Sequence, residues 1–394
     1  MPQTLLDATP AADLFAGQVP FLKPWMGDEE VQAAAQVILS GWVCQGPKVA
    51  EFERLVAKFC AAPFAVATNS CTSALHLTLR LSGVGVGDEV VMPSHTCMAT
   101  ANAVHHCGAV PVFADIDPLT YNLDPCSAEA AITARTKAVI LVHQIGLPGN
   151  VERFDEIARR HGISLIEDGA CSFGASYHGR PVGGLGHPTC FSFHPRKMVS
   201  TAEGGMIVTG DASLSDRARV LRSTGASVSD LDRHIARGAI VQQYEDFGYN
   251  YRMTDIQAAI GVVQMSKLEQ MLAERRRQAV RYDSALNPSG EVTGPFVPDG
   301  LVHSYSSYLV RIGRGGAQRR DAILRRMAEL GVSCRVGIQP LHWEPFYSEK
   351  CRGLDLPHTE EVARSTMFLP IFPGLTEPEQ DRVIQVLFDC LAVC

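Results

Sequence analysis

Apolar and amphipathic segments alternate along most of this chain of 394 residues. Two helical patterns come first: Asp28 suits the N-cap of a helix that runs to about Gly41, and Pro47 suits the first turn of a second helix. Seven short apolar runs follow, separated by helical patterns: FAVAT (64–68), EVVMP (89–93), PVFAD (111–115), AVILVH (138–143), SLIED (164–168), CFSF (190–193) and GMIVT (205–209). This alternation predicts an α/β fold with a mostly parallel sheet.

The pattern changes in the last third of the chain. A long helical period covers residues 255–286, a Gly/Pro-rich segment covers 289–300, and a strand, a helix and a strand are predicted within 305–338. Since 394 residues exceed what one compact core usually supports, we expect two domains. The first, large domain would cover 1–275, with an N-terminal helical segment and most of the long helix, and a small α/β domain would cover 276–394.

Composition narrows the classes of partner. The net charge is −7 and charged residues make up 20% of the chain, which argues against a nucleic-acid or anionic-membrane surface. The N-terminus lacks a basic stretch before an apolar run, and no segment approaches the roughly 18 apolar residues of a membrane helix. The 12 cysteines form no CxxC pair, so neither disulfides nor a metal site are expected. These features indicate a soluble cytoplasmic protein that acts on small molecules or proteins.

Polar residues directly follow two of the predicted strands, at the sheet edge where open parallel sheets bind ligands. NSCTSALHLTL, after the first strand, places small hydroxyl residues before a helix, and the free N–H groups of such a helix end can hold a phosphate. The alternative is a simple N-cap by Ser70 or Thr72. Glu167 and Asp168 form an acid pair at another strand end, where the alternative role is to accept hydrogen bonds from nearby backbone.

Lys197 follows the aromatic run FSF and precedes the strand GMIVT. Apolar flanks of this kind would desolvate the ammonium group and lower its pKa, as in lysines that form Schiff bases, although a lysine in a loop is more often solvated. Together with the phosphate cradle and Asp168, which lies 197 − 168 = 29 residues earlier, this lysine describes a site for pyridoxal 5′-phosphate. The cradle would hold the phosphate, the carboxylate would keep the pyridine nitrogen protonated, and the lysine would form an imine with the aldehyde.

Nine segments support a more specific identification. They are QGPKVAEFE, NSCTSALHLTL, GVGVGDEVVMPSHTCMATANAV, GAVPVFADID, IEDGACSFGASYHG, FSFHPRKMVSTAEGGMIVT, FGYNYRMTDIQAAIGVVQ, PLHWEPFY and FLPIF. In this order they make the chain resemble the DegT-type sugar or aminocyclitol aminotransferases, which are fold-type I enzymes dependent on pyridoxal phosphate. The resemblance extends from about Phe21 to Leu387. It implies a large domain with a mostly parallel sheet and a small C-terminal α/β domain.

The resemblance also implies roles for individual residues. The residues it assigns to the cofactor are Cys71, Thr72, Ser73, Cys97, Asp168, Cys171, Ser192, Lys197 and Asn250. Among them, Lys197 would carry the Schiff base and Asp168 would contact the pyridine nitrogen, so these two are the expected catalytic residues. Ser192, Thr72 and the backbone beside Thr72 would bind the phosphate. Asn250 would reach the phosphate from a second subunit, which requires a homodimer with a shared site.

Two positions depart from the family pattern. Cys97 stands where the family usually has an aromatic residue stacked on the cofactor ring, and Cys171 stands where it usually has a glutamine near the cofactor hydroxyl. Loss of the aromatic face would remove about 0.5–1.5 kcal/mol of stacking, for which His95 is a candidate replacement. The two cysteines would serve either as small apolar pocket residues or in a redox role.

The implied activity is transfer of an amino group from an amino acid, expected to be glutamate, to a keto-sugar linked to a nucleotide or to a keto-cyclitol. Such a reaction belongs to amino-sugar biosynthesis, for antibiotics or polysaccharides. The candidate substrate residues are Arg252, His303, His342 and Trp343, for which the alternative is helix surface or domain packing. A sugar dehydratase or deoxygenase of the same family is a second hypothesis, although such relatives replace the lysine with histidine. A non-catalytic regulator on this fold, suggested by Cys97 and Cys171, is a third.

Overall fold

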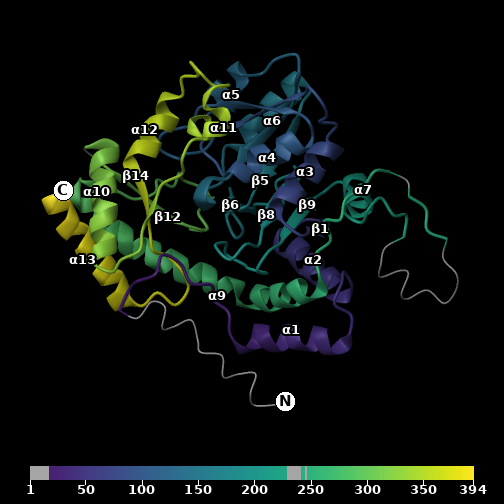
Figure 1. Cartoon of the computed structure of the whole chain (residues 1–394), viewed down its shortest axis with the longest axis horizontal. Coiled ribbons are helices and arrows are strands. Elements are labelled where there is room, and N and C mark those ends of the chain that lie inside the picture. The colour runs from purple at the N-terminus through teal and green to yellow at the C-terminus, as the bar shows by residue number, and fades with distance from the viewer. Residues whose placement is uncertain (1–16, 229–240, 245, 314) are drawn as a thin grey trace.

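The structure is a computed structural model that describes residues 17–228, 241–244, 246–313 and 315–394 (Figure 1). Its helices are α1 (Asp28–Ser40), α2 (Pro47–Phe59), α3 (Cys71–Leu81), α4 (Met98–His106), α5 (Pro125–Ala130), α6 (Val151–His161), α7 (Ala212–Arg222), α9 (Asp255–Leu286), α10 (Gly316–Glu329), α11 (Pro345–Ser348), α12 (Pro357–Ser365) and α13 (Glu377–Val393). Its strands are β1 (Phe64–Thr68), β2 (Glu89–Pro93), β3 (Val110–Ala114), β4 (Thr136–Val142), β5 (Ser164–Asp168), β6 (Ser176–Tyr177), β7 (Arg180–Pro181), β8 (Thr189–Ser192), β9 (Gly205–Thr209), β10 (Val292–Thr293), β11 (Leu301–Val302), β12 (Tyr308–Ile312), β13 (Arg335–Val336) and β14 (Thr366–Leu369).

A seven-stranded sheet with the order β1-β9-β8-β5-β4-β2-β3 forms the centre of the molecule. The seven apolar runs of the sequence are these seven strands, and all neighbours are parallel except β9, which runs antiparallel to β1 and β8. The predicted α/β fold with a mostly parallel sheet is therefore confirmed. Every residue of β2 and of β9 is buried, which explains why these segments are apolar throughout instead of alternating.

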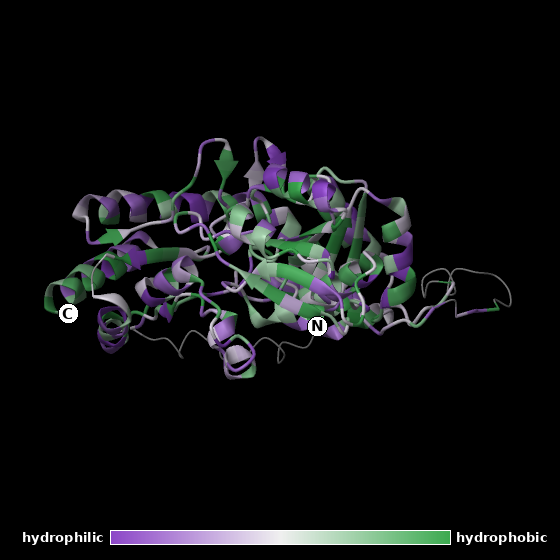
Figure 2. Ribbon diagram, turned by 90° about the horizontal axis from the view of Figure 1, so that it is seen from above, coloured by the Kyte–Doolittle hydropathy of each residue, from purple (hydrophilic) through white to green (hydrophobic). Residues whose placement is uncertain are grey.

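Helices cover both faces of this sheet, with apolar strands enclosed between them (Figure 2). On one face, α2, α6 and α9 supply large side chains such as Phe52, Phe154 and Met271 to a common core cluster. On the other face, α3 and α4 contribute Leu75 and Val104 to a second cluster. Because both faces are covered, ligands reach the strands only at their ends.

The long helix α9 connects the central sheet to a second, four-stranded sheet with the order β10-β12-β14-β13, as Figure 1 shows. The predicted strand, helix and strand of 305–338 are β12, α10 and β13, but all pairings in this second sheet are antiparallel. The expected boundary between 275 and 276 falls inside α9, so the two-domain division remains a prediction. Of the expected large domain, residues 1–16 and 229–240 lie outside the described residues.

The first two helices begin somewhat differently from the prediction. Gly27, not Asp28, is the N-cap of α1, and the Glu30 carboxylate compensates for the missing side chain by accepting a hydrogen bond from the Gly27 N–H at 2.8 Å. Pro47 is the first residue of α2, as predicted. Within the described residues, no helix is both long enough and apolar enough to cross a bilayer.

Candidate active site

The start of α3 supplies the predicted cradle. Ser70 is its N-cap, in extended conformation, and its hydroxyl accepts a hydrogen bond from the Ser73 N–H at 3.1 Å. Ser70 is thus the N-cap, as the alternative role for this segment predicted. The helix end can still bind a phosphate, because Ser70 occupies only the Ser73 N–H. The N–H groups of the first helical residues, Cys71 and Thr72, have no partner within a helix and lie at its positive end.

Strand register brings Ser192 to the same edge. Thr68 pairs with Gly205 across β1 and β9, and Gly205 pairs with Ser192 across β9 and β8. A Cβ atom on Gly205 would lie 2.3 Å from the carbonyl carbon and oxygen of Ser70, so only glycine lets the start of α3 rest against β9. The result is a hydroxyl and a helix N-terminus at one strand edge, which fits a phosphate group.

The acid pair at the end of β5 divides between two environments, because successive strand residues point to opposite faces. A hydrogen bond of 2.7 Å joins the Glu167 carboxylate and the His143 ring, and both side chains are fully buried. Asp168, which is also buried, accepts hydrogen bonds from the Thr100 hydroxyl at 2.8 Å and from the Ala170 N–H at 3.1 Å. Of the two acids, only Asp168 therefore contacts the first turn of α4.

The sequence patterns did not predict the contact of Thr100 with Asp168. Thr100 lies in the first turn of α4, four residues after Thr96, with which it also exchanges a hydrogen bond at 3.2 Å. Two threonines at helical spacing directly after an apolar strand were the available signal. A hydroxyl that donates to Asp168 fixes the position of this carboxylate.

Lys197 lies in the turn that follows β8, and its amine donates a hydrogen bond to the Cys171 sulfur at 3.1 Å. The turn is closed by the Lys197 N–H, which donates to the His194 carbonyl at 2.8 Å. The expectation of a lowered lysine pKa is wrong for the ligand-free chain. Burial does lower the pKa of Lys197, but the Cys171 sulfur and then the Asp168 carboxylate outweigh burial, and the net pKa is above its ordinary value.

These groups fit pyridoxal phosphate. A helix N-terminus with a neighbouring hydroxyl suits its phosphate, a buried carboxylate suits a protonated pyridine nitrogen, and an amine suits its aldehyde. The requirement for glycine at 205 supports the fit, since any side chain there would displace the cradle. Residues of α3, β5 and β8 would thus hold the cofactor at one edge of the central sheet.

The two departures from the family pattern lie on this edge. Cys97 is exposed at the N-cap of α4, and Cys171 is partly buried beside Lys197. His95, the candidate replacement for the aromatic face, has an exposed fraction of 0% and its ring lies 6.3 Å from the ring of Tyr121. A side chain without exposed surface offers no face to a ligand, so the suggestion that His95 stacks on the cofactor is wrong.

The four candidate substrate residues occupy different settings. His342 bonds to the Ser94 hydroxyl at 2.7 Å and to Glu360 at 3.3 Å, and so ties the end of β2 to α12. Trp343 is 36% exposed, and the Arg364 guanidinium lies 4.9 Å from its ring centroid. His342 therefore matches the domain-packing alternative, whereas Trp343 retains an open face.

His303 and Arg252 complete this set. The His303 ring is buried, stacks on Tyr305 at 4.2 Å and accepts a hydrogen bond from the Tyr305 N–H at 2.7 Å. A Cβ atom on Gly146 would lie 3.2 Å from both this ring and the Cys171 carbonyl, so His303 approaches the lysine side of the site. Arg252 is partly buried, and its charge contributes to a lowered pKa of Arg222, which is caused mainly by burial.

Asn250 is exposed on its own chain. Its backbone carbonyl accepts a hydrogen bond from the Asn69 side chain at 3.4 Å, one residue before the N-cap of α3. Asn250 thus lies near the phosphate cradle, with a side chain that is open to contacts from outside the chain.

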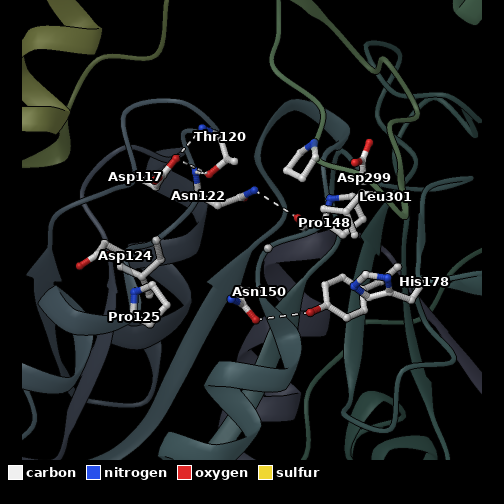
Figure 3. Close-up of a pocket in the computed structure, with 14 residues that line it drawn as sticks. Asp117, Thr120, Asn122, Asp124, Pro125, Pro148, Asn150, His178, Asp299 and Leu301 are labelled. Carbon is white, nitrogen blue, oxygen red and sulfur yellow. Dashed lines mark hydrogen bonds between the residues drawn. The ribbon is translucent and has the colours of Figure 1, made fainter.

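A cavity of about 290 Å³ lies beyond these residues, between the turn that follows β3, the start of α6 and residues 298–301 (Figure 3). Its polar side chains largely bond within the chain: Asp117 accepts from Thr120, and Asn122 donates to the Pro148 carbonyl. Neither Lys197 nor Asp168 lines it. The chemistry described above therefore belongs to the strand edge and not to this cavity.

Comparison with known proteins gives a consistent result. A sequence model of the DegT/DnrJ/EryC1/StrS aminotransferase family matches residues 24–388. The spore coat polysaccharide biosynthesis protein SpsC of Bacillus subtilis (strain 168) is 37% identical over 375 residues, which cover 94% of this chain and 96% of that protein. The aminotransferase TlmJ from Streptoalloteichus hindustanus is 34% identical with a TM-score of 0.86, over 95% of this chain and 99% of TlmJ.

A third similarity concerns a structure that contains the cofactor. The PLP-form of the sugar aminotransferase Spr1654 from Streptococcus pneumoniae, described as putative, is 27% identical to this chain. Its TM-score is 0.88, over 95% of this chain and 99% of that chain. The fold is thus shared over almost the full length of both chains.

Thr100→Val would remove the hydroxyl that supports Asp168 and keep the shape of the side chain. We expect pyridoxal phosphate to bind at least about tenfold more weakly, because a hydrogen bond to a charged group contributes about 1.5–3 kcal/mol. The measurement is the Kd of the cofactor, from its visible absorbance. Thr100→Ser keeps the hydroxyl and serves as the control, and an unchanged Kd in the valine variant would show that Asp168 does not depend on Thr100.

The pH dependence of protein stability tests the burial of two histidines. Burial lowers the pKa of His95 and of His303 to about 3 in the folded chain, whereas a histidine of the unfolded chain titrates near 6.5. Between these values the unfolded chain binds more protons, so stability falls as pH decreases from about 6.5 towards 3, by up to about 1.4 kcal/mol per pH unit for each residue.

His95→Leu should remove one of these two contributions. We expect the free energy of unfolding of this variant, measured with urea between pH 7 and 4, to depend less steeply on pH than that of the natural chain. His358→Gln, at an exposed position, is the matched control. Equal slopes in the natural chain and His95→Leu would contradict the proton linkage.

Proposed function

This chain belongs to the DegT/DnrJ/EryC1/StrS aminotransferase family, and we propose that it transfers an amino group from glutamate to a nucleotide-linked keto-sugar or a keto-cyclitol. The coarser activity, pyridoxal-phosphate-dependent amino transfer to a keto-sugar, follows from the family and from the sugar aminotransferases that share its fold. The observation that supports amino transfer by this chain is the placement of Lys197, Asp168 and the α3 cradle at one edge of the sheet.

The cofactor supplies an aldehyde that takes up the amino group and a cationic ring that accepts electrons. Asp168, held in place by Thr100, would pair with the ring nitrogen and keep it protonated. Lys197 would hold the aldehyde through Nζ, and its free amine would take a proton from the donor α-carbon and pass it on. The start of α3 and Ser192 hold the phosphate, which fixes the position of the other groups.

The two other hypotheses have less support. A sugar dehydratase or deoxygenase would be expected to carry histidine in place of Lys197, and the lysine is present beside Asp168. The regulator hypothesis rested on Cys97 and Cys171, but neither cysteine disrupts the arrangement of the lysine, the carboxylate and the cradle. The expected cytoplasmic location remains a prediction.

A homodimer with shared active sites is part of the proposal. The exposed side chain of Asn250, close to the start of α3, is suited to reach the phosphate of a second copy. Arg252 and Trp343 are proposed to contact the substrates, whereas the buried His303 matches the packing alternative. Arginine is suited to the donor carboxylate or a substrate diphosphate, and Trp343 has an open aromatic face.

The amination reaction can be tested in two halves. With L-glutamate alone, we expect the visible absorbance of the cofactor form to disappear, and with a keto-sugar then added, we expect an amine product by mass spectrometry. Lys197→Ala should slow both halves by at least about 100-fold, because general acid–base catalysis contributes that much or more. Lys58→Ala, at an exposed position of α2, is the control.

The acceptors should include keto-sugars with and without a nucleotide, and keto-cyclitols. Bleaching by another amino acid but not by glutamate would refute the donor, and no product from any acceptor after normal bleaching would refute the acceptor class. Undiminished turnover in Lys197→Ala would refute the lysine assignment.

Complementation tests the shared site. Lys197→Ala and Asn250→Ala homodimers should each be impaired, because every site lacks one of the two groups. A heterodimer of the two variants, purified through different tags, has one complete site if Asn250 acts across subunits, so its activity should be about half that of the natural dimer. If Asn250 acts within its own subunit, neither site is complete and the heterodimer stays inactive.

A further inference from the structure

The amine of Lys197 is held by the sulfur of Cys171 at 3.1 Å. The resemblance to known aminotransferases implied only that Cys171 stands near the cofactor hydroxyl in place of a glutamine. The observed contact gives this cysteine a different partner, the amine itself. Both residues are partly buried, so water competes weakly for either group.

The backbone of Cys171 is fixed on several sides. It lies in the turn after β5, where the Gly169 N–H donates to the Cys190 carbonyl at 2.9 Å and the Ser172 N–H donates to the Gly169 carbonyl at 2.9 Å. The Ser304 hydroxyl donates to the Cys171 carbonyl at 3.0 Å. These bonds fix the backbone that carries the sulfur independently of Lys197, and the short Cys171 side chain is therefore better suited to position the long lysine than the reverse.

Other titratable groups around the amine come from three elements. Cys71 at the start of α3 is kept neutral, since burial and the nearby Asp168 raise its pKa well above its usual value. Cys190 in β8 has a pKa raised in the same direction by burial. His194, in the turn that precedes the lysine, has a lowered pKa, mainly because of burial. Burial lowers the pKa of the amine, and the groups that raise this pKa are the Cys171 sulfur, which contacts the amine, followed by Asp168 and Cys71.

We propose that Cys171 is a positioning residue for Lys197, whose sulfur holds the amine at the sheet edge whenever the amine is not bonded to the cofactor. The proposal rests on the proposed role of Lys197. During the reaction the lysine nitrogen is released, takes one proton from the donor α-carbon and gives the same proton to the cofactor. Cys171 accepts a hydrogen bond from that nitrogen and neither gains nor loses a proton overall.

This arrangement addresses a specific difficulty. A released lysine has a long side chain with several rotatable bonds, and holding it near the reacting atoms has an entropic cost. A hydrogen bond to a fixed sulfur reduces the number of positions that the amine can take. Because N–H···S bonds are weaker than bonds to a carboxylate, the amine can still leave the sulfur to bond to the aldehyde.

The proton affinity of Lys197 can be measured without any reaction. In the cofactor-free protein, competitive acetylation of Lys197 as a function of pH, followed by peptide mass spectrometry, reports the apparent lysine pKa. We expect Cys171→Ala to lower this pKa and to speed acetylation below it by about tenfold, as for loss of a hydrogen bond to a charged group. Cys126→Ser, at an exposed position of α5, should behave as the natural protein.

Cys171→Ser keeps a hydrogen-bond acceptor beside the amine. We therefore expect both the glutamate half-reaction and the acetylation rate to return towards those of the natural protein relative to Cys171→Ala. An acetylation profile of Cys171→Ala that coincides with that of the natural protein would overturn the proposal, as would a half-reaction unaffected by either substitution.

If the Cys171 variants fail to fold, the contact between Cys171 and Lys197 can be tested by changing the lysine instead. Because an adjacent lysine speeds the reaction of a cysteine, iodoacetamide should modify Cys171 several-fold more slowly in Lys197→Ala than in the natural protein. An equal or faster rate would contradict the pairing. The outcomes also separate from those of the amination experiment: a changed lysine pKa with no aminated ketone would refute the proposed substrate and leave the role of Cys171 intact.

Discussion

The register of β9 between β1 and β8 is the constraint on which the site depends. This antiparallel strand aligns Thr68, Gly205 and Ser192 across three strands, and thereby places a hydroxyl beside the start of α3. A shift by one residue would turn every side chain of β9 to the opposite face of a sheet that is covered on both faces. It would also move Gly205 away from the Ser70 carbonyl, where only glycine fits. Core packing and cofactor binding therefore require the same register.

The sequence predicted the features that depend on local patterns. The seven strands, the cap at Ser70 and the positions of Asp168 and Lys197 at strand ends follow from apolar runs and from the polar residues that terminate them. It could not predict contacts between segments that are distant in the sequence. Thr100 meets Asp168 from 68 residues away, Ser304 meets Cys171 from 133 residues away, and His342 meets Ser94 from 248 residues away. Each contact requires knowledge of how helices and the second sheet pack against the strand ends.

Polar contacts from the C-terminal part of the chain converge on these strand ends. Ser304 bonds to the turn after β5 and His342 bonds to Ser94 at the end of β2, so segments on either side of β12 approach the cofactor edge. His303, adjacent to Ser304, is buried and neutral in the folded chain because burial lowers its pKa to about 3. A neutral ring places no positive charge near Lys197 and so does not oppose protonation of the lysine.

The raised pKa of Lys197 is compatible with its proposed work as a base once the charge on Asp168 is considered. In the ligand-free chain, burial lowers the lysine pKa, but Cys171 and Asp168 raise it by a larger amount, so the net pKa is above its ordinary value. A protonated ring nitrogen paired with Asp168 would compensate the carboxylate charge, and that part of the increase would disappear. Burial, the largest influence on the amine, would then meet less opposition, so the pKa of Lys197 would decrease on cofactor binding. The lowered pKa expected from the apolar flanks of Lys197 is wrong for the free chain. Cofactor binding and lysine basicity are coupled through this one carboxylate.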